Sequence, residues 1–269
     1  MGLQPPPPSR APRAGSVQIT DRDRVLLAFA AEQRFVIADQ IAVLLGVSVT
    51  TAAGRLRALS GGGYLHRERR LHLQPACHRI TRDGLGAVGS DLPAPRRVDL
   101  ATYRHDLGLG WLMLAAHRGR FGAVAEVISE RHMRSHDGRA SERCDRFGIR
   151  LGGTGPGGRQ RLHYPDAVLV TATGHRVALE LELSTKARDR RERILSAYGA
   201  DRRIDAVVYL VDRPGVGAAI ERSARRVGVS GILRVQRVTL GGAEAAAAGG
   251  QSAARQHRHG AAPAVPASR

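Results

Sequence analysis

The sequence predicts a mixed α/β protein in two parts, a mostly helical first part and a second part in which strands and helices alternate. Helical periodicity recurs three times between residues 21 and 59, with a short glycine turn before the third helix. Strand patterns at residues 167–170 and 176–183 are joined by turn-forming residues, and helix and strand patterns alternate from there to residue 240. With 269 residues, the chain is long enough for two modest cores.

The three helices of the first part have recognisable ends. Thr20 is placed to cap a helix that runs to about residue 33, with acidic residues in its first turn. A second helix is expected at 38–45, where Gly46 stops it. Ser48 can cap a third helix at 49–59, whose core-facing residues are Ala52, Leu56 and Leu59.

A basic hairpin is expected after the third helix. Its first strand covers residues 64–67, a turn falls at 68–70, and the second strand runs through Leu71 and Leu73. Residues 80–84 then either close the hairpin or open a short helix. Three helices followed by a basic hairpin look like a winged helix, a DNA-binding arrangement. The candidate DNA-binding residues are Thr50, Thr51, Arg55 and Arg57 on the third helix, and Arg67, Arg69 and Arg70 on the hairpin.

Charge supports the same partner. A formal net charge of +18 predicts attraction to polyanions, with double-stranded DNA the first candidate and a membrane surface the competing one. No apolar run reaches the length of a membrane span. Cys77 and Cys144 lie far apart in the sequence and form no metal-binding motif, which favours a reduced, cytoplasmic protein. Composition leaves the oligomeric state open.

An acidic strand organises the second part. Residues 176–183 alternate strictly, so that Glu180 and Glu182 share the face opposite the apolar residues. Asp166 precedes the neighbouring strand. A turn with an odd number of residues, such as 173–175, brings all three acids to one side, whereas a two-residue turn puts Asp166 on the other side. Clustered carboxylates repel one another, and a divalent cation such as Mg²⁺ is the usual reason to keep them together.

Lys186 follows this strand and is the only lysine among the 42 Lys and Arg residues. A compact ammonium is not interchangeable with a guanidinium beside a phosphate or a water. Lys186 is therefore a candidate for the same site, and the alternative is an exposed residue at the start of a helix.

A Pro-Asp pair, a strand, a turn, and an acidic strand ending near a lysine resemble the PD-(D/E)xK nuclease fold. With the N-terminal part, residues 18–238 resemble the replication-relaxation family of plasmid and mobile-element proteins. The resemblance implies Asp166, Glu180, Glu182 and Lys186 as catalytic residues, the three acids as Mg²⁺ ligands, and other replication or mobilisation proteins as partners. The sequence departs from the nuclease pattern in one respect: Glu182 stands where the lysine is expected, and Lys186 lies four residues further on.

The remaining segments complete the expected organisation. Residues 1–16 are expected to be a disordered leader, 17–90 the winged helix, 91–97 a linker, 98–240 the nuclease-like domain, and 241–269 a disordered tail. Within 98–240 we expect helices at 98–118, 185–198 and 214–227, and strands at 124–128, 204–211 and 232–240. Residues 131–158 show no periodicity and are expected to form a mobile insertion or an irregular hairpin. His105 and Asp106 fall near the start of the first of these helices, where they either join the site or cap and pack the helix.

Three functions remain open. The first is a duplex DNA-binding protein acting in plasmid or mobile-element replication or DNA relaxation, whose second domain keeps a nuclease-like fold. The second is an active Mg²⁺-dependent endonuclease or nickase, and the third and weakest is a transcriptional regulator. The residues alone do not decide whether the protein is an enzyme.

Overall fold

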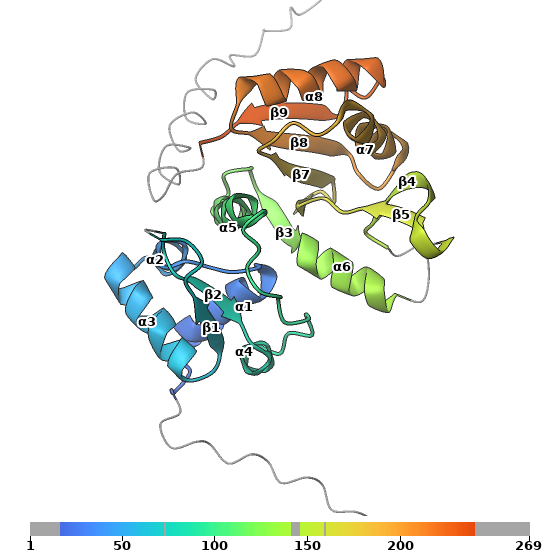
Figure 1. Ribbon diagram of the computed structural model, residues 1–269. Helices are drawn as coiled ribbons and strands as arrows, with labels where there is room; N and C mark the ends of the chain where they lie inside the picture. The colour runs from blue at the N-terminus through green and yellow to red at the C-terminus, as the bar shows by residue number, and fades with distance from the viewer. Residues whose placement is uncertain (1–16, 73, 141–145, 159, 240–269) are drawn as a thin grey trace, which may run out of the picture.

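The computed structural model describes residues 17–239 except 73, 141–145 and 159. The leader and the tail expected at the two ends of the chain lie outside the described residues. Figure 1 shows a smaller helical part, at the bottom of the view, against a larger part built on a sheet. The chain is thus of the mixed α/β class that the sequence predicts.

The three N-terminal helices form where the sequence predicts them: α1 (Asp21–Glu32), α2 (Ala38–Leu45) and α3 (Val49–Gly61). Thr20 and Asp23 make a reciprocal capping box at the start of α1. Gly46 ends α2 with a φ of 65°, a left-handed conformation that suits glycine. The Oγ of Ser48 accepts a hydrogen bond from the amide of Thr51 at the start of α3.

The hairpin that follows has a longer loop than expected. Its strands are β1 (Leu65–Glu68) and β2 (Cys77–Ile80), and α4 (Arg82–Ala87) begins directly after it. The expected second strand through Leu71 and Leu73 is wrong: Leu71 lies in the exposed loop, and Leu73 is outside the described residues. Burial decides the pairing, because Leu65 pairs with Ile80 and both are buried in the core.

The larger part is built on a five-stranded sheet of order β3-β6-β7-β8-β9. β3, β6 and β7 are antiparallel neighbours, whereas β7, β8 and β9 run parallel. The bounds of the strands are β3 Val124–Ser129, β6 Ala167–Thr171, β7 Arg176–Glu182, β8 Ala206–Val211 and β9 Leu233–Arg237.

Helices cover both faces of the sheet (Figure 1). α5 (Tyr103–His117) packs on one face through Leu112 and Met113, which share a cluster with Leu179 and Leu181 of β7. α7 (Arg188–Ala200) and α8 (Pro214–Arg226) pack on the other face, in a second cluster that includes Ala178. Alternation along β7 therefore directs Glu180 and Glu182 toward the α7 side. α5 starts later than expected, because the preceding residues form a turn in which the amide of Ala101 donates to Asp99.

Between β3 and β6 lies an element that the sequence analysis missed. α6 (Glu130–Arg139) is a helix capped by Ser129, and its buried residues are only Met133 and Asp137. With so few apolar positions, helical periodicity is hidden in the sequence. The irregular hairpin expected here is present as β4 (Ile149–Thr154) and β5 (Gln160–His163), with the short 3₁₀ helix η1 (Pro156–Gly158) between them.

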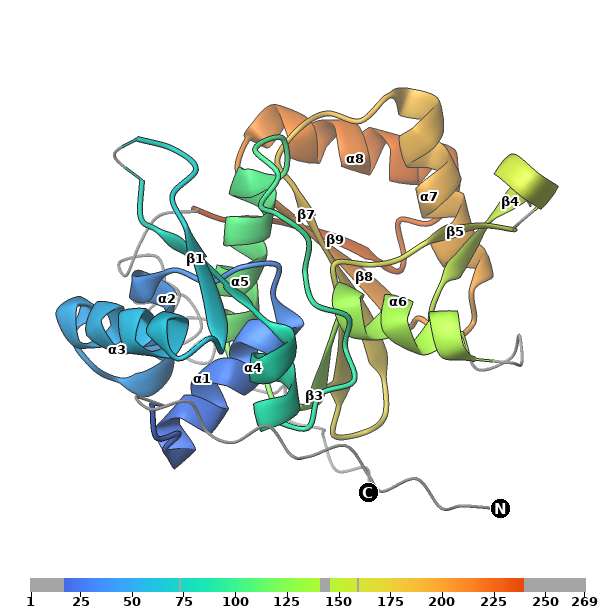
Figure 2. The same ribbon diagram turned by 60° about the horizontal axis from the view of Figure 1, so that its bottom comes forward.

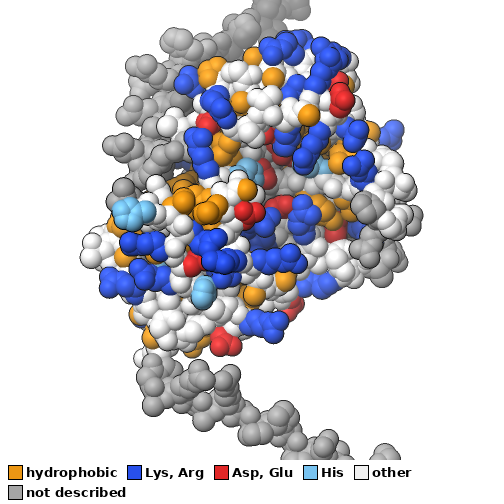
Figure 3. Space-filling view, in the orientation of Figure 1, with side chains coloured by type: hydrophobic (Ala, Val, Ile, Leu, Met, Phe, Trp, Pro, Cys, Tyr) orange, Lys and Arg blue, Asp and Glu red, His pale blue; other side chains and the backbone are white. Residues whose placement is uncertain are grey.

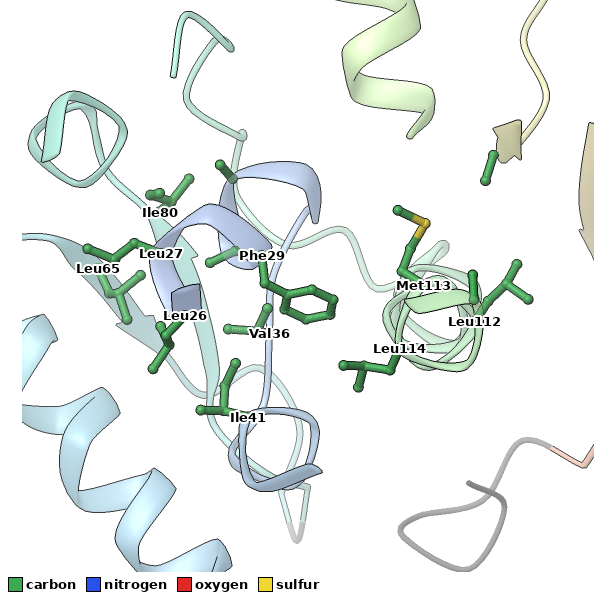
Figure 4. Packing of buried hydrophobic residues seen from close by; sticks show 14 of the residues in the cluster. Leu26, Leu27, Phe29, Val36, Ile41, Leu65, Ile80, Leu112, Met113 and Leu114 are labelled. Atoms are coloured by element: carbon green, nitrogen blue, oxygen red, sulfur yellow. The ribbon is translucent and has the colours of Figure 1, made fainter. Parts of the chain in front are cut away.

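The two parts share one hydrophobic cluster, which runs from α1 and α2 through α5 to the sheet. Figure 4 shows Phe29 of α1 between the N-terminal core and Met113 and Leu114 of α5. Gln40 of α2 donates a hydrogen bond of 3.0 Å to the carbonyl of Leu107 on α5. The segment 91–97, expected as a linker, is bonded to both parts: the Pro95 carbonyl accepts from Arg79 at 2.8 Å, and the Pro93 carbonyl accepts from Arg131 at 2.7 Å. α5 therefore contacts both the N-terminal helices and the sheet.

Candidate functional site

The turn between β6 and β7 sets the position of the acidic residues. The amide of Thr171 donates to the carbonyl of His175, which leaves the three residues 172–174 as the loop, and Gly174 has a φ of 83°. A loop with an odd number of residues is what the sequence analysis requires for the three acids to share one side of the sheet. The loop starts one residue earlier than the expected 173–175. Ala167 pairs with Leu179, so the next step of the register brings Asp166 opposite Glu180.

The side chain of Asp166 contacts both β7 and α5. Its Oδ2 accepts a hydrogen bond of 2.7 Å from the amide of Leu181, and His105 Nε2 of α5 lies 3.3 Å from the same oxygen. The carboxylate is 12% exposed. Burial and the neighbouring Glu180 raise the pKa of Asp166, and the contact with His105 opposes that rise.

Glu180 is held from two other elements. His163 Nε2, at the end of β5, lies 2.6 Å from Glu180 Oε1, and the hydroxyl of Tyr198 on α7 donates to the same oxygen. Burial raises the pKa of Glu180, but His163, Lys186 and Tyr198 together lower it by more, so the group stays ionised. The pKa of Tyr198 rises well above its usual value because the hydroxyl is buried beside this carboxylate.

Lys186 bends back to the acidic strand. Its Nζ forms an ion pair with Glu182 Oε2, and the lysine side chain is only 26% exposed. The Lys186 carbonyl accepts a hydrogen bond of 3.0 Å from Arg191, which fixes the turn before α7. Burial lowers the pKa of Lys186, and the charges of Glu180, Glu182 and Asp166 raise it by more. Burial also raises the pKa of Glu182, with Lys186 opposing. The structure thus brings Lys186 to the three acids.

His105 and Asp106 take both of the roles left open by the sequence. Asp106 accepts a hydrogen bond of 2.8 Å from Thr102 Oγ1 and lies 3.4 Å from Arg34 Nε, which packs the start of α5 against the N-terminal part. His105 instead reaches Asp166. Burial lowers the pKa of His105, but Asp106 and Asp166 raise it more strongly, to about 10.

This carboxylate cluster, defined by Asp166, Glu180 and Glu182, has oxygen donors that suit Mg²⁺. Among the described residues, no group of three His, Cys, Asp or Glu side chains is arranged to hold a metal ion. In the same part of the chain, Asp166 Oδ1, Glu180 Oε2 and Glu182 Oε1 accept no hydrogen bonds, because the bonds named above all use the other oxygens. The donor set fits a hard cation, while its present arrangement is closed by protein contacts.

The predicted DNA-binding residues divide into two groups. Thr50, Thr51 and Arg57 of α3 are exposed, as are Arg67 and Arg69 of the hairpin, and Arg70 is half-buried. Arg55 differs. Its Nε lies 2.5 Å from Asp23 Oδ1, its Nη2 pairs with the other oxygen, and it also donates to the carbonyl of Gln18 at 2.8 Å. Arg55 therefore holds α3 to α1. Unlike the exposed residues, it is not available for contact with DNA.

The basic β1–β2 loop lies on the same side of the molecule as the start of α5, whose His105 contacts the carboxylate cluster (Figure 2). In Figure 3, acidic and histidine side chains lie in a hollow at the centre of one face, with Lys and Arg side chains above and below it. The hairpin is tied to this region because Glu68 accepts a hydrogen bond of 3.1 Å from the amide of Val98.

Two residues that contact the carboxylate cluster, His163 and Tyr198, were missed by the sequence analysis as site residues. His163 stands three residues before Asp166, at the start of the motif, and that proximity is the signal that could have found it. Tyr198 was expected only as an apolar residue of the helix at 185–198. Its hydroxyl needs a partner once it is buried, and helical spacing alone does not reveal which one.

Comparison of the chain with models of protein families, with curated proteins and with solved structures finds no match in any of the three. The class of the protein therefore depends on its own fold and residues. No single helix in the described part of the chain is both long and apolar enough to cross a membrane.

Proposed function

We propose that this protein binds duplex DNA through α3 and the β1–β2 loop. The observation that carries the proposal is the combination of exposed Thr50 and Arg57 on α3 with exposed Arg67 and Arg69 on the adjoining hairpin. The element order, three helices and then a two-stranded hairpin, supports this proposal because it resembles the order in a winged helix. A helix of this kind fits the major groove, where threonine and arginine side chains reach base edges.

Electrostatics favours this partner over a neutral one. The net charge of +18 attracts a polyanion at long range, and hairpin arginines suit contacts with phosphates. We further propose that the sheet-based part is a PD-(D/E)xK-like domain of a replication-relaxation protein, acting in plasmid or mobile-element replication. The mixed five-stranded sheet with its acidic strand β7 supports that likeness.

DNA binding is tested with the full chain, because the N-terminal core is shared with α5. Arg57→Ala is expected to weaken binding more on a selected duplex than on random DNA. Arg69→Ala combined with Arg70→Ala should weaken both alike and reduce the slope of log K against log salt by about two units. The matched control is Arg222→Ala, an exposed arginine of α8. If the wild type shows no salt-dependent binding, or the control loses as much affinity as Arg57→Ala, the proposal fails.

A second candidate function is Mg²⁺-dependent DNA cleavage, favoured by the contact between Lys186 and Glu182. Asp166, Glu180 and Glu182 would hold the ion, which lowers the pKa of a bound water. His163 and Tyr198 would orient Glu180, and Lys186 would offset charge at the phosphate.

Cleavage is tested on supercoiled DNA with Mg²⁺ or with chelator. An active enzyme nicks only with the metal, and both Asp166→Asn and Lys186→Arg lose nicking while keeping DNA affinity. A protein that binds DNA with no cut in either condition is a binding protein, and release of the DNA by a small molecule would then favour the transcriptional regulator.

A further inference from the structure

A second basic site lies at the C-terminal end of α7. A cavity of about 370 Å³ opens between the C-terminal end of α7 and the β4–β5 hairpin. Four arginines line it: Arg146 before β4, Arg150 on β4, and Arg202 and Arg203 after α7. Its volume is within the range of small-molecule sites.

The charge of this arginine cavity is not balanced from within. Asp201 is the acid in its lining, and both of its oxygens are taken by Arg203, at 2.9 Å and 2.6 Å. Among the described residues, Arg146, Arg150 and Arg202 form no ion pair. Arg203 also donates to the carbonyl of Gly148 at 3.2 Å, so it is fixed as part of the wall. The charges of the other three lining arginines are thus not neutralised by ion pairs within the described part of the chain.

One donor in the wall is buried without a partner. Arg146 Nε is shielded from solvent and makes no hydrogen bond within the described part of the chain. A buried N–H without an acceptor is unfavourable, but this one is shielded from the cavity as well as from bulk solvent, so it does not by itself identify a ligand. Arginine forks match the oxygens of a phosphate in geometry as well as in charge.

The lining also indicates which part of a ligand is recognised. It contains Leu162, Ala197 and Ala200 but no aromatic ring, so a nucleobase has nothing to stack on. We propose that the arginine cavity binds a polyphosphate group, as found in pyrophosphate or in the tail of a nucleotide, without regard to the base. The phosphates of a single nucleic-acid strand are the other source of the same chemistry.

The lining of this cavity includes none of the three acids of the carboxylate cluster. α7 has 13 residues and is therefore about 20 Å long, with Lys186 before its first turn and the cavity at its last. Lys186 is therefore about one helix length from the cavity, whereas His163 and Tyr198, which contact Glu180, directly follow the lining residues Leu162 and Ala197 in the chain. The inference does not rest on duplex binding by α3.

The test is calorimetric titration of the full chain with pyrophosphate at low ionic strength, with ATP and CTP as competitors. Saturable binding is expected, and the two nucleotides should compete equally well. Arg150→Ala and Arg202→Ala change exposed residues and should each weaken pyrophosphate binding about tenfold, the loss of roughly one charge-assisted hydrogen bond. Arg222→Ala and Arg57→Ala should leave it unchanged.

The outcomes show which source of phosphate the cavity binds and whether the proposal is correct. If a single-stranded oligonucleotide displaces pyrophosphate and Arg150→Ala weakens both, the cavity serves a strand; if it does not, the cavity serves a free polyphosphate. Absence of saturable binding overturns the proposal, as does an equal loss in Arg222→Ala, which would reflect net charge alone. Because Arg57→Ala is predicted to affect duplex DNA only, either function can fail without the other.

Discussion

Replacing Arg55 by alanine is expected to destabilise the protein by about 2–3 kcal/mol, because it leaves a buried carboxylate without its cation. The Asp23 side chain is 2% exposed and receives two hydrogen bonds of 2.7 Å from Thr20 in addition to those from Arg55. Breaking a fully buried ion pair costs about 3–5 kcal/mol. We place this pair lower, since Arg55 is 32% exposed and Thr20 still satisfies part of Asp23.

The measurement is the free energy of unfolding from urea titration followed by circular dichroism. Arg57→Ala is the matched control, since it removes an exposed arginine from the same helix and should change stability by less than about 0.5 kcal/mol. Arg55→Ala should thus lose stability, whereas Arg57→Ala should lose DNA affinity. If Arg55→Ala is as stable as Arg57→Ala, the ion pair does not hold α3 to α1.

The difference in stability should also depend on pH. Burial raises the pKa of Asp23, but hydrogen bonds from Arg55 and Thr20 lower it by more, to below 3.8. A carboxyl with a depressed folded pKa contributes stability above its unfolded pKa and loses it as the pH falls through the folded pKa. The gap between wild type and Arg55→Ala should therefore be full at neutral pH and narrow below pH 3.8. A gap that does not vary with pH would point to lost packing instead.

Two further perturbations follow from the packing and the charges. Gly84→Ala should lower the free energy of unfolding by about 1–3 kcal/mol, because the added Cβ would lie 2.2 Å from the Tyr64 carbonyl oxygen. Gly86→Ala in the same helix meets nothing within 4 Å and should be neutral or stabilising by up to about 1 kcal/mol. Equal melting temperatures for the two variants would contradict this. The stability contributed by His105 is complete below its usual pKa of 6.5 and is lost as the pH rises through about 10. His105→Gln should abolish that alkaline loss in a series of thermal melts, and an unchanged alkaline slope would show that His105 is not its source.

Much of the fold could be predicted because local signals and burial agree. The caps at Thr20 and Ser48 and the glycine at 46 fix the N-terminal helices to within two residues. The prediction of the second hairpin strand was wrong because local signals and burial disagree there. Leu71 and Leu73 look like a strand locally, but the core takes Cys77 and Ile80, and only tertiary packing reveals that choice. α6 was missed for a related reason, since a helix that buries Met133 and Asp137 has almost no apolar stripe.

For the carboxylate cluster, the sequence predicted the acids and left their contacts open. Strict alternation in β7 and the parity of the turn were enough to bring Asp166 opposite Glu180. The partners come from elements distant in the chain: His163 from β5, Tyr198 from α7 and His105 from α5. Nothing in local periodicity predicts such contacts, because they depend on how the helices pack on the sheet.

The charge balance of the carboxylate cluster limits what it can do. With all three acids ionised, Lys186 and a protonated His105 offset two of three negative charges and leave one. These two cations therefore already offset most of the repulsion between the acids that a metal would relieve. If a divalent cation does enter, as under the second candidate function, it reverses the sign of the net charge, and a DNA phosphate would restore neutrality. Metal and DNA should then raise each other's affinity by the same factor. A cluster that only ties β5, β7 and α7 together would show no such coupling, so the coupling separates a structural ion-pair network from a site that acts on DNA.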